Sequence, residues 1–204
     1  MRPPSFQWER KLIAQGFELV AGVDEVGCGA LAGPVFAGAV ILPLDSRLGN
    51  VRDSKLLSAE AREDLYPLIA KRAVAWAVAS ATVEEIADLN IRGASLLAMR
   101  RAVESLSIQP HYLLVDAWKI PNTTIPQTGT IKGDRLIKSI AAASIMAKVT
   151  RDRLMIEAAE QFPVYGFEIH KGYATEKHRA ALKTYGPCSL HRLSYQMFKE
   201  GNSA

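Results

Sequence analysis

The sequence contains only two cysteines, Cys28 and Cys188, among its 204 residues, and they form no CxxC motif. A disulfide framework is therefore not expected, and a reducing, cytoplasmic location is the default expectation. The first sixteen residues lack the apolar core of a signal peptide. The longest apolar run, residues 30–44, is interrupted by two glycines and two prolines. This run is too short and too broken to span a bilayer, so no membrane association is expected.

Several common catalytic signatures are also absent. The chain has no GxSxG, HExxH or P-loop motif, no internal repeat and no Gly/Ser linker. Its four histidines are scattered, and for His170 and His178 phosphate contact or plain exposure is favoured over metal binding. With 49% hydrophobic residues, the chain can bury a sizeable core. We expect residues 1–204 to form one domain, with a short tail from about residue 195.

The charge pattern gives a mild indication of a polyanionic partner. The formal net charge is only +4, which many globular proteins share. Basic residues nevertheless gather in two segments, 132–153 and 170–179.

The order of the predicted elements indicates an α/β fold. Candidate caps are Ser58 and Thr175, each before a segment rich in helix-forming residues. A hairpin-rich first part, followed by strands alternating with helices, favours a mixed sheet flanked by helices. The expected strands are 18–26, 35–42, 73–81, 111–116 and 128–132, and the expected helices are 7–15, 58–70, 83–88, 91–106, 134–159 and 176–184.

Four acidic residues stand beside apolar segments, where solvated surface charge explains them poorly. Asp24, Glu25 and Asp116 close strand-like runs, and Asp134 opens the long helical segment. Such carboxylates suit a site for hard divalent cations, which prefer oxygen ligands. Two such ions can neutralise charge and activate water during phosphodiester hydrolysis. Each acid taken alone could instead be a helix cap or an exposed strand end, with Asp134 the best N-cap candidate.

Asp24 and Glu25 are adjacent, and adjacent side chains on a regular strand point to opposite faces. Both reach one site only through a local distortion, or through a backbone carbonyl of one of them. Asp24 is favoured as the central ligand. Cys28, in the glycine-rich turn that follows, is either a small buried thiol or, less favoured, a nucleophile.

Six motifs in this order resemble those of ribonuclease HII, the type 2 ribonuclease H of bacteria. The resemblance covers about residues 20–194. The motifs are GVDEVGCGALAGPV, RDSKLLS, YLLVDA, KGD, IAAASIMAKVTRDRLM and HKGYAT. It implies a ribonuclease H-like fold, with a five-stranded mixed sheet and helices on both sides. It also implies an Mg²⁺- or Mn²⁺-dependent endonuclease that cuts the RNA strand of RNA–DNA hybrids. Such enzymes also cut 5′ to a single ribonucleotide in duplex DNA, leaving 3′-hydroxyl and 5′-phosphate ends.

The resemblance assigns the catalytic, metal-binding acids to Asp24, Glu25, Asp116 and Asp134. It assigns substrate contacts to the Gly27-Cys28-Gly29 loop, which would sense the 2′-hydroxyl, and to Tyr173, which would stack on the following nucleotide. The family usually has arginine where this chain has Cys28. Further expected substrate contacts are Ser54, Lys55, Lys148 and Arg151.

Two other functions remain open from the sequence. One is another ribonuclease H-like nuclease, such as a junction resolvase, which would not require a 2′-hydroxyl. The other is a catalytically silent duplex-binding module, against which the four acids argue, because they would repel phosphate unless metal ions intervene. Nothing in the sequence indicates more than a monomer.

Overall fold

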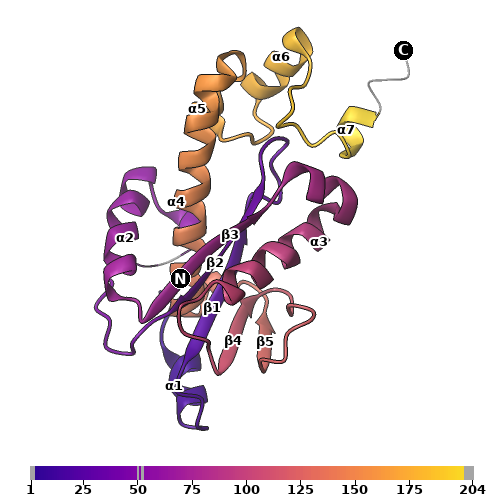
Figure 1. Ribbon diagram of the computed structural model, residues 1–204. Coiled ribbons are helices and arrows are strands. Elements are labelled where there is room, and N and C mark those ends of the chain that lie inside the picture. The colour runs from indigo at the N-terminus through magenta and orange to yellow at the C-terminus, as the bar shows by residue number, and fades with distance from the viewer. Residues whose placement is uncertain (1–2, 50, 52, 200–204) are drawn as a thin grey trace.

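A computed structural model of the chain describes residues 3–49, 51 and 53–199. Its centre is a five-stranded mixed sheet, in the order β3-β2-β1-β4-β5 (Figure 1). Strands β1, β2 and β3 pair antiparallel, whereas β4 runs parallel to both β1 and β5. The strands are β1 (Val20–Val26), β2 (Val35–Ile41), β3 (Ala75–Ala81), β4 (Tyr112–Asp116) and β5 (Gln127–Thr130). The predicted α/β class and mixed five-stranded sheet are confirmed.

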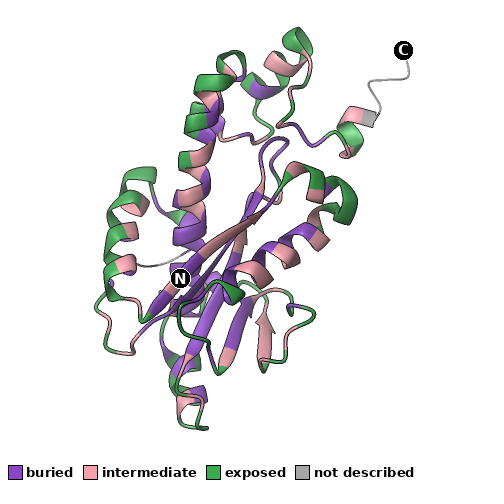
Figure 2. Cartoon of the chain, viewed as in Figure 1, coloured by how far each residue is buried: buried purple, intermediate pink, exposed green. Residues whose placement is uncertain are grey.

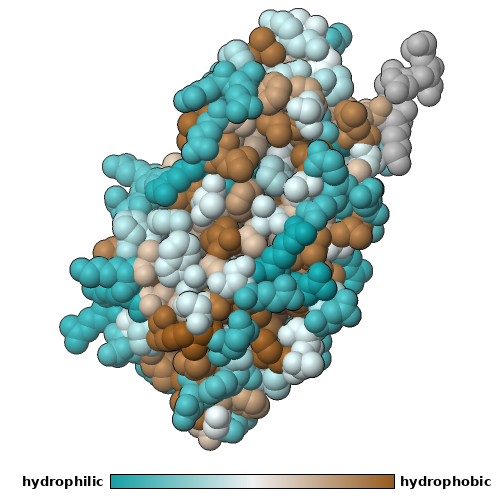
Figure 3. Space-filling model, viewed as in Figure 1, coloured by the Kyte–Doolittle hydropathy of each residue, from teal (hydrophilic) through white to brown (hydrophobic). Residues whose placement is uncertain are grey.

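Helices cover both faces of the sheet. Helix α3 (Val83–Glu104) packs on one face, while α4 (Lys138–Gln161) packs on the other with α2 (Ala59–Arg72) beside it (Figure 1). Separate hydrophobic clusters fill the two layers. The strands are largely buried, and exposed residues follow the outer sides of α2 and α3 (Figure 2). Hydrophilic side chains lie over these two helices, with hydrophobic ones scattered between them (Figure 3).

Helix α4 lies unusually close to the sheet because small residues face each other across the contact. Its segment 139–147 is buried throughout. A Cβ atom on Gly22 of β1 would overlap the backbone of Ser139, and one on Gly38 of β2 would overlap Ala143. These glycines are needed for close approach of two backbones. The small residues 141–144 of α4 allow this close packing, which brings α4 directly against β1 and β2.

Most predicted boundaries agree with the structure within a few residues. Ser58 and Thr175 cap α2 and α6 (Glu176–Tyr185) as expected. Asn90 interrupts α3 with a φ of 58°, which corresponds to the break expected between two helices. The predicted start of the long helix at residue 134 was wrong. Asp134 lies in a 3-10 turn (Gly133–Arg135), and α4 begins at Lys138. Asp134 is therefore not its N-cap.

Residues 163–199 form a separate layer beyond the end of β1 and the start of β2 (Figure 1). It contains a 3-10 turn (Pro163–Tyr165), α5 (Phe167–His170), α6 and α7 (Gln196–Lys199). The expected tail is only partly covered, because residues 200–204 lie outside the described residues. Helix α1 (Gln7–Ile13) and the 3-10 turn Ser54–Leu56 complete the fold. Within the described part of the chain, no helix has the length and apolar character needed to cross a bilayer.

Candidate active site

Three of the four predicted acids meet where strands β1 and β4 end. Asp24 and Glu25 lie near the carboxyl end of β1, and Asp116 is the last residue of the adjacent parallel β4. One carboxylate oxygen from each of the three lies within 4.8 Å of the others. Parallel neighbouring strands place their carboxyl ends at the same edge, which explains the meeting. The resulting oxygen-rich group suits a divalent cation.

Asp24 and Glu25 converge without the backbone distortion that the sequence led us to expect. Pairing with β2 continues regularly through both residues. Asp24 faces α4, where the nearby Ser144 hydroxyl favours its charged form and so lowers its pKa, and Glu25 faces Cys28 on the α3 side. The parallel pairing with β4 ends at Val23, opposite the residue before Asp116, so Asp24 and Glu25 lie where β4 ends, and their carboxylate oxygens approach each other there.

Burial, followed by the crowding of like charges, sets the electrostatics of this group. Burial raises the pKa of Asp24 well above its usual range, and the charges of Glu25 and Asp116 raise it further. Burial and the charge of Asp116 likewise raise the pKa of Glu25, and burial raises that of Asp116. The Oε2 atom of Glu25 is buried with no hydrogen-bond partner among the described residues. A cation between these carboxylates would relieve each of these costs.

Asp134 lies beside the group, and the acid whose charge affects it most is Asp53. Burial, followed by the charges of Asp53 and Asp116, raises the pKa of Asp134 to about 6. Asp53 also accepts hydrogen bonds from the Lys55 amide at 2.9 Å and from Arg135 Nε at 3.1 Å. Asp53 is a site residue that the sequence analysis did not assign. Asp53 directly precedes Ser54 and Lys55, which were both predicted as substrate contacts, and this position could have indicated it.

Ser54 and Lys55 lie at this site in different ways. Ser54 is buried and its hydroxyl hydrogen-bonds that of Ser144 at 2.9 Å, so it supports the α4 contact of Asp24. Partial burial lowers the pKa of Lys55, but the charges of Asp24, Asp134 and Asp53 outweigh this and raise it overall. Lys55 is thus a cation at the edge of a strongly acidic cluster.

The Gly27-Cys28-Gly29 loop follows β1 directly and lies next to Glu25. The Cys28 thiol is 3.6 Å from Glu25 Oε1 and 3.1 Å from Ser95 Oγ on α3. Burial and the charge of Glu25 raise its pKa to about 11, which argues against a thiolate nucleophile. Cys28 and Glu25 line a pocket of about 290 Å³ together with Trp118, which is half exposed and lies under the Arg92 guanidinium.

Tyr173 lies in the C-terminal layer, next to the same loop. Its backbone forms a bridge with Ala30, just after Gly29. Lys148 Nζ lies 5.1 Å from the centre of its ring, and Lys148 also forms an ion pair with Asp152 at 2.7 Å. Tyr173 and Lys148 line a pocket of about 420 Å³ between α2 and α4. Lys148 is thus a partly buried, paired cation at an open pocket.

Arg151 does not have the position expected of a phosphate ligand. Its side chain is 0% exposed. It donates hydrogen bonds to the carbonyl oxygens of Pro34, Lys171 and Ala32 at 3.0–3.1 Å. It therefore ties two loops to α4, and its donors are taken by protein atoms.

The expectation for His170 and His178 was also wrong. Both are buried, and they stack on each other with ring centres 4.4 Å apart. His178 Nε2 lies 3.0 Å from Nε2 of His191, which is buried too. Neither phosphate contact nor exposure is compatible with this packing.

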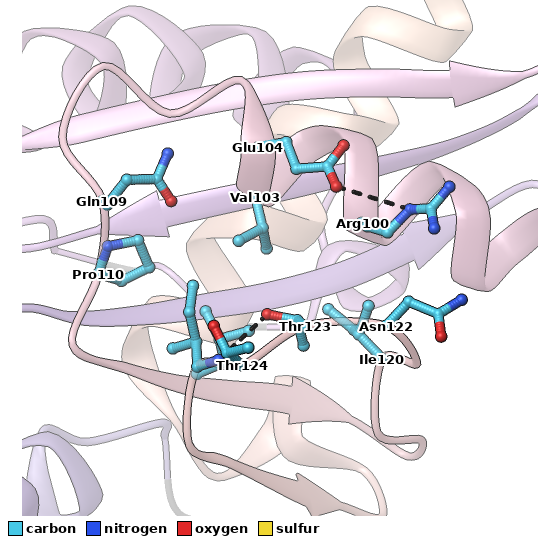
Figure 4. A pocket seen from close by; sticks show the side chains of 11 residues that line it. Arg100, Val103, Glu104, Gln109, Pro110, Ile120, Asn122, Thr123 and Thr124 are labelled. Carbon is cyan, nitrogen blue, oxygen red and sulfur yellow. Dashed lines mark hydrogen bonds and ion pairs between the residues drawn. The ribbon is translucent and has the colours of Figure 1, made fainter.

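Another pocket lies away from the acids. It has about 420 Å³ and lies between the C-terminal end of α3, the start of β4 and the loop 120–125 (Figure 4). Arg100 and Glu104 pair along its α3 side. None of the four acids lines it.

The comparisons with known proteins agree with this geometry. The ribonuclease HII family model matches residues 21–198. The chain belongs to the ribonuclease HII family. It is 54% identical to the ribonuclease HII of Pelotomaculum thermopropionicum over 96% of this chain and 74% of the relative. It is 47% identical to that of Caldicellulosiruptor bescii, over 93% and 92% of the two chains.

A solved structure gives the same fold. The ribonuclease HII of Archaeoglobus fulgidus, solved in complex with PCNA, superposes with a TM-score of 0.76 and 26% identity, covering 91% of this chain and 97% of that one. Members of the ribonuclease HII family are metal-dependent endonucleases that hydrolyse the RNA strand of RNA–DNA hybrids. The acid cluster at the ends of β1 and β4 lies within the matched residues.

Proposed function

We propose that this ribonuclease HII also cuts on the 5′ side of a single ribonucleotide embedded in duplex DNA, by two-metal-ion hydrolysis that leaves 3′-hydroxyl and 5′-phosphate ends. The observation that carries the proposal is the position of the acid cluster beside the Gly27-Cys28-Gly29 loop. The Cys28 thiol contacts Glu25, and Ala30, just after the loop, forms a backbone bridge with Tyr173. A site that cuts and a site that could read a 2′-hydroxyl are thus adjacent.

The residues present fit divalent cations. Asp24, Glu25 and Asp116 offer converging oxygens, and Glu25 has a buried oxygen without a partner among the described residues. We assign these three and Asp134 as the residues that would hold Mg²⁺ or Mn²⁺. Bound there, the ions would supply an activated water and neutralise charge on the phosphate. The Glu25 amide orients Asp24 by donating to its Oδ1 at 2.8 Å, and the Gly133 amide orients Asp116 by donating to its Oδ1 at 2.6 Å.

Lys55 and Lys148 are the cations assigned to the substrate backbone. Lys55 lies at the acid cluster, and Lys148 lies at the pocket beside Tyr173. Contacts of this kind position a duplex without reading its bases. Affinity should therefore fall with rising salt and show little base-sequence preference.

The loop is proposed to act through its backbone. The Cys28 side chain is directed at Ser95 and Glu25, inside the pocket beside α3. Replacing Cys28 with arginine should therefore alter salt-dependent affinity and leave the preference for a ribonucleotide unchanged. A gain in cleavage selectivity in Cys28→Arg would contradict the backbone account.

The function is tested with a labelled DNA duplex that contains one ribonucleotide, incubated with Mg²⁺ and the enzyme. The matching all-DNA duplex and the Asp134→Asn variant are the controls. The expected result is one cut 5′ to the ribonucleotide that is absent from both controls. If the wild-type enzyme cuts an RNA–DNA hybrid but leaves the embedded ribonucleotide intact, the proposal is wrong.

A further inference from the structure

Residues 27–33 are held between two segments that are distant in sequence. On one side, the amides of Leu31 and Ala32 donate to the Gly172 carbonyl, next to Tyr173. On the other side, Gly33 donates to Leu190 and Arg192 donates to Leu31. The segment Leu190–Tyr195, which we call the C-terminal brace, therefore runs along the back of the loop that follows β1.

Two side chains of the brace converge on a single backbone atom of the loop, the Cys28 carbonyl oxygen. Arg192 Nη1 donates to it at 3.2 Å, and the Tyr195 hydroxyl donates to it at 3.1 Å. Arg192 Nη1 also donates to the Tyr195 hydroxyl at 2.8 Å, and Arg192 Nε donates to the Gly33 carbonyl at 2.8 Å. Arg192 is 0% exposed, so its charge acts on these protein groups and does not reach a substrate phosphate.

Fixing this carbonyl also fixes the direction of the next amide. No peptide bond in the described residues is cis, and in a planar trans peptide the C=O and N–H bonds point in opposite directions. With the Cys28 carbonyl directed at the brace, the Gly29 N–H is directed away from it. Gly29 is exposed, and a Cβ atom there would meet nothing within 4 Å.

We propose that Arg192 and Tyr195 are positioning residues for ribonucleotide selection, because they hold the Cys28 carbonyl and thereby aim the Gly29 amide at the substrate. This inference rests on the proposed function. The group that the aimed amide recognises is a hydrogen-bond acceptor, the 2′-oxygen of the ribonucleotide. Neither Arg192 nor Tyr195 touches that group, and both act through the loop.

The test uses Tyr195→Phe, which removes one hydroxyl and keeps the ring. Tyr165→Phe is the matched control, because the Tyr165 hydroxyl also donates to a backbone carbonyl, that of Gly186 at 2.8 Å, in the same C-terminal layer. For each protein, kcat/KM is measured on duplexes whose single sugar carries either a 2′-hydroxyl or a 2′-fluorine, a much poorer acceptor. The melting temperature is measured in parallel.

In Tyr195→Phe, the ratio of the two kcat/KM values should fall roughly fivefold, the size expected for one weakened hydrogen bond. In Tyr165→Phe the ratio should remain that of the wild type, whatever the melting temperature does. An unchanged ratio in Tyr195→Phe overturns the inference, whether activity is kept on both substrates or falls equally on both. If the wild type fails to cut the 2′-hydroxyl duplex, the proposed function itself has failed.

Discussion

The protein buries two groups of charges in different ways, one negative and one positive. The acids Asp24, Glu25 and Asp116 crowd together, and the pKa of each is raised by burial. The arginines Arg151 and Arg192 are more deeply buried, yet each donates to several backbone carbonyls. Buried charge is costly unless it is paired or hydrogen-bonded. The fold therefore supplies a partner for every guanidinium nitrogen of these arginines except Arg192 Nη2, whereas it leaves the acids crowded together, a cost that a bound cation would relieve.

This difference distinguishes residues suited to catalysis from residues that hold the fold in place. A group that the fold leaves strained is a candidate for chemistry, and a group that the fold satisfies is a candidate for positioning. Changing the acids should therefore abolish activity while sparing the fold, whereas changing Arg151 should mainly lower stability.

The largest expected effect comes from Asp24→Asn. Loss of a central carboxylate should reduce kcat on an RNA–DNA hybrid by about 1000-fold or more, which corresponds to roughly 4 kcal/mol. Because the folded pKa of Asp24 is raised, its stabilising contribution exists at low pH and is lost as the pH rises through that pKa. At neutral pH without divalent metal, the variant should thus melt at a higher temperature than the wild type. A lower melting temperature would show that the acid is needed by the fold.

Arg151→Met should have the opposite signature. Three buried carbonyls would lose their donor, so the free energy of unfolding should fall by roughly 3 kcal/mol or more, measured by urea denaturation. Arg153→Met is the matched control on the same helix, since Arg153 is half exposed and its contacts, an ion pair with Glu63 and a position over the Tyr66 ring, lie on the surface. Such surface pairs contribute about 1 kcal/mol or less. Equal stability losses in the two variants would remove the contrast between the buried and exposed arginines.

The sequence predicts the acids better than the arginines for a physical reason. Strand ends are visible in an apolar pattern, and parallel strands bring their ends together, so Asp24 and Asp116 could be placed from sequence. Arg151 and Lys148 lie three residues apart on one helix, and nothing in the pattern says which one is buried. That depends on loops 27–34 and 171–173, which pack against the helix only in the folded chain. The prediction that Asp134 could be an N-cap was wrong for a similar reason, because no sequence pattern indicates the 3-10 turn before α4.

Divalent metal should stabilise the protein in a pH-dependent way. If the acid cluster binds Mn²⁺ or Mg²⁺, an ion at a hundred times its dissociation constant adds about 2.7 kcal/mol at neutral pH. Protons compete for the same carboxylates, and the pKa of Asp134 is about 6. The rise in melting temperature on adding metal should therefore shrink as the pH falls below about 6, and should be much smaller at every pH in Asp24→Asn. A metal-induced rise that is independent of pH would indicate binding elsewhere.

The smallest effect concerns the histidines, whose pH dependence has the opposite sign. His178 Nδ1 lies 3.0 Å from the Tyr173 carbonyl, which fits a donated hydrogen bond and leaves its Nε2 to accept from His191 Nε2. His191 Nδ1 then accepts from the Cys188 amide at 2.9 Å. Both rings are thus satisfied only when neutral, and burial together with the nearby His178 lowers the pKa of His191 to about 4.

A depressed histidine pKa contributes stability that is complete above its ordinary value of about 6.5 and is lost as the pH falls toward about 4. Asp134 acts in the opposite direction over the same range, because its raised pKa adds stability as the pH falls through about 6. His191→Gln removes the titrating ring and retains a donor near Nε2. The loss of unfolding free energy between pH 7 and pH 5, measured without metal, should therefore be smaller in His191→Gln than in the wild type, by about 2 kcal/mol. Parallel pH profiles in the two proteins would mean that the histidines do not oppose the acids, and that the acid cluster alone sets the pH dependence.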